Sequence, residues 1–168
     1  MAGGGVRELF DRLFGQGICP YQFSFILANP IRRLILSPET LVERLELAPD
    51  DSVLELGPGP GFYSPAVARQ LHRGYLTLVD IQPEMLVKAQ RRLEAEGCAR
   101  YGQVVASGTQ LPLRDESQDV AFLVAVLGEV PDQEACLQEL HRVLRPQGLL
   151  SITEQPGAPD HIPGDEVT

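Results

Sequence analysis

The sequence predicts an α/β domain built around a doubly wound, parallel β-sheet. Short apolar runs typical of buried strands alternate with segments whose apolar residues recur at helical spacing. A glycine-rich segment, 55–61, joins the first such strand to the helical pattern that begins at residue 64. With 168 residues and 43% hydrophobic content, the chain can bury one sizeable core. We therefore expect one domain over 1–168, with an N-terminal segment (1–36), a core (37–155) and a tail (156–168).

Composition excludes several classes of function. The net charge is −9 and the basic residues are not gathered into a patch, so we expect no nucleic-acid partner. Cys19, Cys98 and Cys136 are far apart and form no C-x-x-C pair, which predicts no metal site and a reducing, cytoplasmic location.

The N-terminal segment begins with an amphipathic helical pattern over 6–14. An apolar stretch follows at 18–36, but Asn29-Pro30 interrupts it, and Arg32 and Arg33 place two positive charges within it. Its uninterrupted apolar run is far shorter than the roughly 20 residues that a bilayer requires. We therefore do not expect a transmembrane span.

Two structures suit this stretch about equally. It can form a lid over the site, or an amphipathic helix packed against the flank of the sheet. A membrane-surface contact through Arg32 and Arg33 is a less favoured third interpretation. The lid would present three aromatic side chains to a ligand, those of Tyr21, Phe23 and Phe25.

The core elements follow in order, each bounded by a capping or turn residue. Ser37 and Pro38 begin the first core helix as its cap and first residue, and Gly97 ends the third. The run 120–126 is continuously apolar, as in a strand buried on both faces. The expected helices are 38–47, 64–73, 83–96 and 133–144, and the expected strands are 53–56, 76–79, 101–105, 120–126 and 149–154.

The turn at 55–61 has glycine at alternate positions, Gly57, Gly59 and Gly61. Glycine permits backbone angles that a side chain would forbid, and it lets a ligand lie against the main chain. The dinucleotide pattern G-x-G-x-x-G does not fit, because the sixth position counted from Gly57 is Phe62. Asp80 ends the next strand, where an acidic residue can accept from ribose hydroxyls. The alternative is a glycine-rich turn without a ligand.

The pattern E-x-G-x-G-x-G, with an acidic residue one βα unit later, resembles motif I of class I S-adenosylmethionine (SAM)-dependent methyltransferases. The resemblance implies a Rossmann-like sheet with strand order 3-2-1-4-5 and SAM as cofactor. It also implies that SAM lies across the carboxyl ends of the first, second and fourth strands. The residues that it assigns to cofactor binding are Glu55, Gly57, Pro58, Gly59, Gly61, Asp80, Ile81, Ser107 and Gly108.

Segment 106–113 resembles the family's G-D-A-x-x-L-P-F segment, but the family aspartate is replaced by Ser107. A hydroxyl can still bond the adenine amine, although it loses the roughly doubled strength of a charge-assisted bond. We therefore expect weaker cofactor binding. The segments 115–119 and 145–148 resemble the family's D-x-S-F-D and R-P-G-G turns.

The loop 127–130 follows the fourth strand, at the edge where open α/β sheets hold their active sites. It lacks the Asn/Asp-Pro-Pro-aromatic motif of enzymes that methylate amide or base nitrogens. The chain most resembles the ubiquinone and menaquinone biosynthesis type, whose acceptors are small molecules. The resemblance implies in-line attack on the sulfonium methyl. Glu129 and His141 are the polar candidates for a base, and we assign no catalytic residue.

The tail is too short for the family's last two strands, which we expect to be absent. The fifth strand would then present an unpaired edge, which favours self-association or a protein partner. The alternative function is accordingly a catalytically weak or inactive SAM-binding interaction protein.

Overall fold

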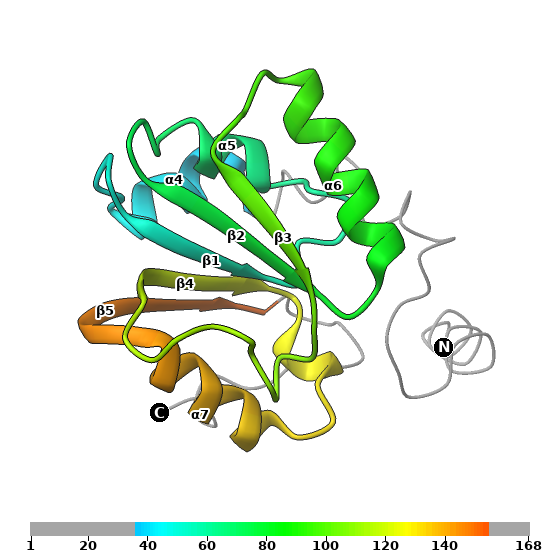
Figure 1. The fold of residues 1–168 in the computed structure, drawn as a ribbon, viewed down its shortest axis with the longest axis vertical. Coiled ribbons are helices and arrows are strands. Elements are labelled where there is room, and N and C mark those ends of the chain that lie inside the picture. The colour runs from blue at the N-terminus through cyan, green and yellow to red at the C-terminus, as the bar shows by residue number, and fades with distance from the viewer. Residues whose placement is uncertain (1–35, 155–168) are drawn as a thin grey trace, which may run out of the picture.

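A five-stranded parallel sheet forms the centre of residues 36–154, the part of the chain that this computed structural model describes. The strand order is β3-β2-β1-β4-β5, which confirms the predicted 3-2-1-4-5 arrangement (Figure 1). All four pairings are parallel. The strands are β1 (Ser52–Leu56), β2 (Tyr75–Asp80), β3 (Tyr101–Val105), β4 (Gln118–Val124) and β5 (Leu144–Thr153).

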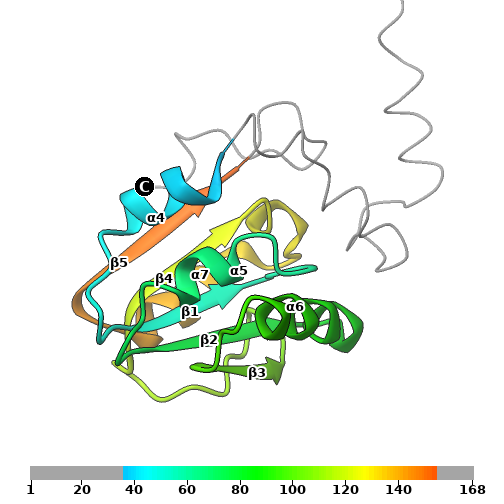
Figure 2. The ribbon, with the colours of Figure 1, turned by 90° about the horizontal axis from the view of Figure 1, so that it is seen from above.

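Helices cover both faces of the sheet, as the doubly wound prediction requires. One face carries α4 (Pro38–Leu45), α5 (Ser64–Ala68) and α6 (Pro83–Ala95), and the opposite face carries α7 (Gln133–Val143) (Figures 1 and 2). Each face has its own apolar cluster. Leu41, Leu45 and Leu93 are buried in the first, and Leu140 and Val143 are buried in the second.

Local signals explain where two of the helices begin or end. The Ser37 hydroxyl accepts a hydrogen bond of 3.1 Å from the Thr40 N–H, which caps α4. Glu46, with φ of 47°, ends that helix after Leu45, two residues before the predicted end at 47. Gly97, with φ of 71°, follows the end of α6, where a residue with a side chain would be strained.

The helix predicted over 64–73 is wrong in its length, because α5 ends at Ala68. Beyond it, the Gln70 and Leu71 N–H groups donate to the carbonyls of Val67 and Ala68, three residues back. The chain forms a tighter turn there. Leu71 is nevertheless buried, which explains why its apolar spacing suggested a longer helix.

Strand boundaries around β4 and β5 also differ from prediction. The fourth strand, expected at 120–126, ends at Val124 because Ala125 takes a φ of 55°, outside the strand region. The turn expected at 145–148 lies within β5 as a bulge. Gln118 of β4 pairs with Leu144, and Val120 pairs with Leu149. The extra residues of β5 between these two pairs form the bulge.

The connection between β3 and β4 sets the place of the site. It crosses the sheet without a helix, and Leu111 within it packs into the cluster under α7. The strand order reverses between β1 and β4, so connections leave these neighbours toward opposite faces. Such a reversal opens a crevice at the carboxyl ends of the strands.

Several predictions concern residues outside the described range. The helix over 6–14, the stretch 18–36 with its aromatic residues and arginines, and the tail 156–168 are among them. Within residues 36–154, the helices are too short and too polar for any of them to cross a bilayer.

Candidate functional site

The glycine turn joins β1 to α5, and all three of its glycines have a positive φ, between 53° and 75°. A Cβ on Gly57 would lie 2.6 Å from a methyl carbon of Val126, and a Cβ on Gly61 would lie 2.7 Å from the Cα of Ala89. Packing alone therefore requires glycine at these two positions. A Cβ on Gly59 would meet nothing within 4 Å, so Gly59 leaves main chain open to a ligand.

Asp80 connects the end of β2 to this turn. Its Oδ1 accepts a hydrogen bond of 2.9 Å from the Gln82 N–H, and its Oδ2 accepts a longer one of 3.4 Å from the Gly59 N–H. The residue is 7% exposed. Burial raises the pKa of Asp80, and the backbone N–H groups of Gln82, Gly59 and Ile81 oppose that shift. The carboxylate is thus held at the turn with its position fixed by main-chain donors.

Glu55 lies behind the turn, within β1, and is 3% exposed. Its Oε2 makes no well-formed hydrogen bond, and the nearby Ser64 hydroxyl is the polar side chain that acts on it. Burial raises the pKa of Glu55 to about 8; the Ser64 hydroxyl opposes the shift and the charge of Asp80 adds to it. The side chain does not line the cleft described next, so any contact with a ligand there must be indirect.

A cleft opens at the carboxyl ends of β1, β2 and β4, in front of the glycine turn. Its empty volume is about 830 Å³, part of which is open to solvent. The cleft is lined by residues 56–59, 79–82, 106–108, 124–126 and 129–131, together with Met85.

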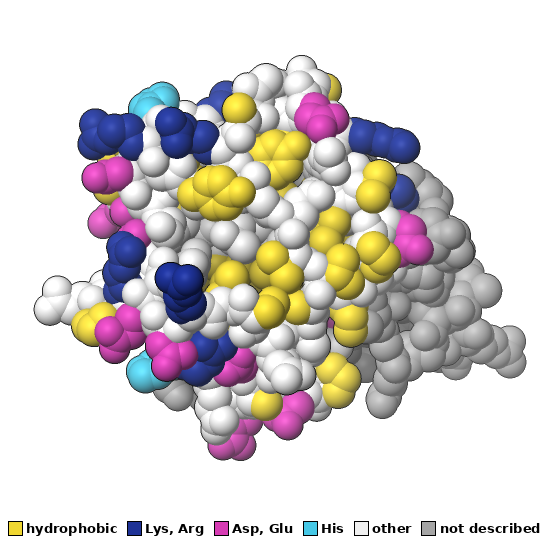
Figure 3. All heavy atoms as spheres, in the orientation of Figure 1, with side chains coloured by type: hydrophobic (Ala, Val, Ile, Leu, Met, Phe, Trp, Pro, Cys, Tyr) yellow, Lys and Arg dark blue, Asp and Glu magenta, His cyan; other side chains and the backbone are white. Residues whose placement is uncertain are grey.

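One wall of the cleft is apolar and exposed. Ile81 is 48% exposed although it follows a buried strand. Tyr75 and Val105, on β2 and β3, are also exposed but do not line the cleft, and hydrophobic side chains gather across the middle of the face shown in Figure 3. A flat apolar ligand group against Ile81 would remove part of this surface from water.

Ser107 and Gly108 form the wall beside Ile81. The Ser107 hydroxyl lies 2.8 Å from that of Thr109 and accepts from the Thr109 N–H at 3.2 Å. It is therefore already engaged in a local turn. A Cβ on Gly108 would lie 3.1 Å from both Cys136 Sγ and Leu56, which explains glycine there by close packing.

The segment after β4 forms the opposite wall. Ala125 has a left-handed φ of 55° and its N–H donates to the Thr153 carbonyl at 2.7 Å. A short 3₁₀ helix, η2 (Leu127–Glu129), follows where the sequence predicted a loop. Glu129 lines the cleft. His141 does not; it lines a separate hollow with the bulge of β5, so the two candidate bases are not brought together.

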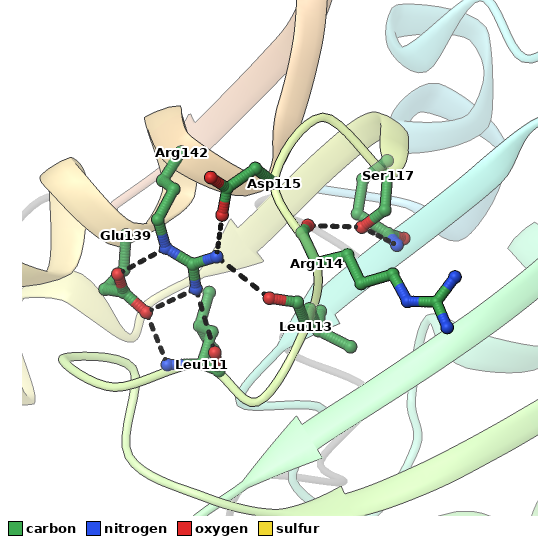
Figure 4. Close-up of polar contacts among 8 residues, drawn as sticks. Leu111, Leu113, Arg114, Asp115, Ser117, Glu139 and Arg142 are labelled. Atoms are coloured by element: carbon green, nitrogen blue, oxygen red, sulfur yellow. Dashed lines mark hydrogen bonds and ion pairs between the residues drawn. The ribbon is translucent and has the colours of Figure 1, made fainter.

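Arg142 on α7 holds the segment that follows Ser107 and Gly108 (Figure 4). Its guanidinium donates to the carbonyls of Leu111 and Leu113, both at 2.9 Å, and to Asp115 at 2.6 Å. It also makes two bonds to Glu139, at 2.7 and 2.8 Å. Hydrogen bonding from Arg142 is the main cause that lowers the pKa of Glu139. One wall of the cleft is thereby fastened to α7.

Sequence reasoning placed Gly57, Pro58, Gly59, Asp80, Ile81, Ser107 and Gly108 at one site, and all of them line the cleft. Glu55 and Gly61 were predicted with them, but the first lies behind the turn and the second packs against α6. The cofactor-binding roles of all nine residues stay predictions. Sequence reasoning did not single out Gln82, Met85, Ala125, Val126 or Pro131, which also line the cleft, whereas Glu129 and Val130 lie in the loop that it placed at this edge.

A family model described as "Methyltransferase domain" matches residues 54–152. The arsenite methyltransferase of Halobacterium salinarum is 30% identical over 109 residues, covering 64% of this chain and 28% of the relative. The demethylmenaquinone methyltransferase of Chlamydia caviae is 29% identical over 117 residues, covering 70% of this chain and 50% of the relative. The chain thus spans half or less of these two relatives.

Among solved structures, a SAM-dependent methyltransferase from Aquifex aeolicus superposes with a TM-score of 0.80 at 24% identity. The match covers 89% of this chain and 85% of that one. At this identity, the likeness shows the shared fold.

Proposed function

Because the chain belongs to the methyltransferase domain family, we propose that it binds SAM in the cleft and transfers the methyl group to a small-molecule acceptor. The observation that carries the proposal is the pairing of Gly59 with Asp80. An open main-chain surface and a fixed carboxylate meet at the carboxyl ends of neighbouring parallel strands. This is where a nucleoside ligand binds in open α/β sheets.

The residues of the cleft suit the parts of the cofactor. Asp80 can accept from ribose hydroxyls, because its Oδ2 makes only a long bond of 3.4 Å to Gly59. Ile81 offers an apolar surface to the adenine ring, beside Ser107 and Gly108. Glu55 acts on the methionine end from behind the turn, through backbone or ordered water. The engaged Ser107 hydroxyl gives no charge-assisted bond to the adenine, which supports the expectation of weaker binding.

SAM supplies an electrophilic methyl group, so the protein contributes mainly by bringing the acceptor into line. Proximity and orientation can account for up to about 7 to 11 kcal/mol of a barrier. The wall at 124–126 and 129–131 lies beside the glycine turn, because Val126 packs against Gly57. We assign this wall to the acceptor. It is mostly apolar, which favours acceptors with an apolar body.

Isothermal titration of the full chain with SAM tests the proposal. We expect micromolar binding by the wild type and at least a tenfold loss in Asp80→Asn, because the amide is a weaker acceptor for ribose hydroxyls. Asp50→Asn is the matched control, since Asp50 is exposed and outside the cleft. NAD should give no signal.

Absence of SAM binding by a chain shown to be folded by circular dichroism would overturn the proposal. If Asp80→Asn bound SAM as tightly as the wild type, the proposal that SAM binds in this cleft would be wrong.

A further inference from the structure

The carboxyl end of β5 is bonded to the wall of the cleft that follows β4. The pairing of the two strands ends with Val124 and Thr153. Beyond it, the Ala125 N–H donates to the Thr153 carbonyl at 2.7 Å, and the Leu127 N–H donates to Oε1 of Glu154 at 3.1 Å. Any residue at position 153 would offer the first acceptor, whereas the second bond depends on the side chain at position 154.

Leu127 is the first residue of η2, where a helix has no internal acceptor for its N–H groups. Its side chain is 1% exposed and packs in the apolar cluster under α7. A carboxylate makes a stronger hydrogen bond to an N–H group than a neutral acceptor does. Removal of the Glu154 side chain would leave this partly buried donor without that acceptor, which destabilises η2 where it begins.

Val126 transmits the position of η2 to the glycine turn. A Cβ on Gly57 would lie 2.6 and 2.9 Å from the two methyl carbons of Val126, so the valine is in direct contact with the turn. The Val126 carbonyl accepts from the Glu129 N–H at 2.9 Å, which ties η2 to the same residue. A displacement of η2 would therefore move Val126 and change the space beside Gly57.

We propose that Glu154 is a positioning residue for the part of the cleft that receives the amino-acid end of SAM and the acceptor. This inference rests on the proposed function, in which Asp80 and Ile81 hold the adenosine. Glu154 is not among the residues of 36–154 that line the cleft, so it acts through Leu127 and Val126. Loss of its carboxylate should therefore weaken binding of one half of the cofactor and spare the other half.

The test is titration of the full chain with SAM and, separately, with 5′-methylthioadenosine, which keeps adenine and ribose but lacks the amino-acid end. We expect Glu154→Ala to bind SAM about three- to tenfold more weakly than the wild type, with its affinity for 5′-methylthioadenosine unchanged. Glu154→Gln retains an oxygen that can accept from Leu127, so it should restore most of the SAM affinity. Glu43→Ala, at an exposed position on α4, is the control and should bind both ligands as the wild type does.

Hydrogen exchange of the ligand-free chain tests the structural step by itself. We expect residues 125–130 to exchange about tenfold faster in Glu154→Ala than in the wild type, because the first N–H of η2 has lost its acceptor. Exchange at 101–105, in the distant strand β3, should be unchanged and would show that the variant keeps its fold.

Wild-type SAM affinity in Glu154→Ala would overturn the inference and leave the proposed function standing. An equal loss of affinity for both ligands would also overturn it, because Glu154 would then act on the stability of the whole cleft. Unchanged exchange at 125–130 in the same variant would show that η2 does not depend on Glu154. Failure of the wild type to bind SAM would overturn the proposed function and the role of Glu154 together.

Discussion

Glu55 is a buried carboxyl group directly behind the glycine turn, and it shows how one residue links stability to the site. Its Oε2 makes no well-formed hydrogen bond, and burial raises its pKa to about 8. The folded protein therefore favours the protonated form near neutral pH. Ionising Glu55 in this buried position costs free energy, because no cation within residues 36–154 lies close enough to offset its charge.

This residue predicts a pH dependence of stability. The pKa of Glu55 is raised on folding from 4.5 to about 8, so the folded state binds the proton more tightly. Its contribution is fully present below about pH 4.5 and is lost as pH rises toward 8. We expect chemical denaturation at pH 5, 7 and 9 to show that the unfolding free energy of Glu55→Gln rises by a few kcal/mol relative to that of the wild type as pH increases.

Comparing the variant with the wild type at each pH separates Glu55 from the other titrating groups, Asp80 among them. Glu43→Gln on the exposed side of α4 provides the control and should follow the wild type. A difference between Glu55→Gln and wild type that is constant with pH would show that Glu55 ionises normally in the folded state.

At the scale of elements, the connection between β3 and β4 depends on a side chain from another element. It has no helix of its own, and Arg142 of α7 bonds the carbonyls of Leu111 and Leu113 within it. The same connection begins with Ser107 and Gly108, which line the cleft. Packing of α7 on the sheet thus determines where one wall of the site lies.

Arg142→Lys should loosen this wall. Lysine keeps the charge but cannot reproduce the planar set of donors, so at least one carbonyl loses its partner. We expect about 1 to 3 kcal/mol lower unfolding free energy and faster hydrogen exchange at 107–115. Arg91→Lys, on an exposed part of α6, should change neither quantity. Unchanged exchange at 107–115 in Arg142→Lys would mean that the connection is held by its apolar contacts alone.

Elements with strong local signals could be predicted from the sequence. The inward residues of α6 and the limits of β3 agree with their apolar pattern and with Gly97. The end of β4 could not be predicted, because Ala125 adopts a left-handed φ although alanine gives no such signal. The bulge in β5 depends on pairing with β4, a contact between distant residues that periodicity does not report.

The site shows the same division. Glycine spacing and Asp80 predicted one side of the cleft, because glycine marks an unusual backbone conformation and aspartate marks a charge at the end of a strand. The wall at 124–126 and 129–131 consists mainly of Val, Ala and Pro, which look like ordinary core residues in a sequence. Gly61 was assigned to the ligand although its contact with Ala89 already requires glycine.

At the scale of the whole molecule, the reversal of strand order between β1 and β4 creates the crevice, and each wall comes from a different connection. The sheet, the glycine turn and Asp80 all belong to residues 36–154, and they frame the cleft in which we propose that SAM binds. The wall at 124–126 and 129–131 lies beside them, and we propose that it meets the acceptor. The predicted association through the edge of β5 stays a prediction.

The most direct test of this account is a crystal structure of the full chain with S-adenosylhomocysteine bound. The account predicts the adenosine in the cleft, with the ribose hydroxyls within hydrogen-bond distance of Asp80, the adenine on Ile81 and the main chain of Gly59 against the ligand. A ligand bound outside this cleft, or a ribose that does not meet Asp80, would contradict it.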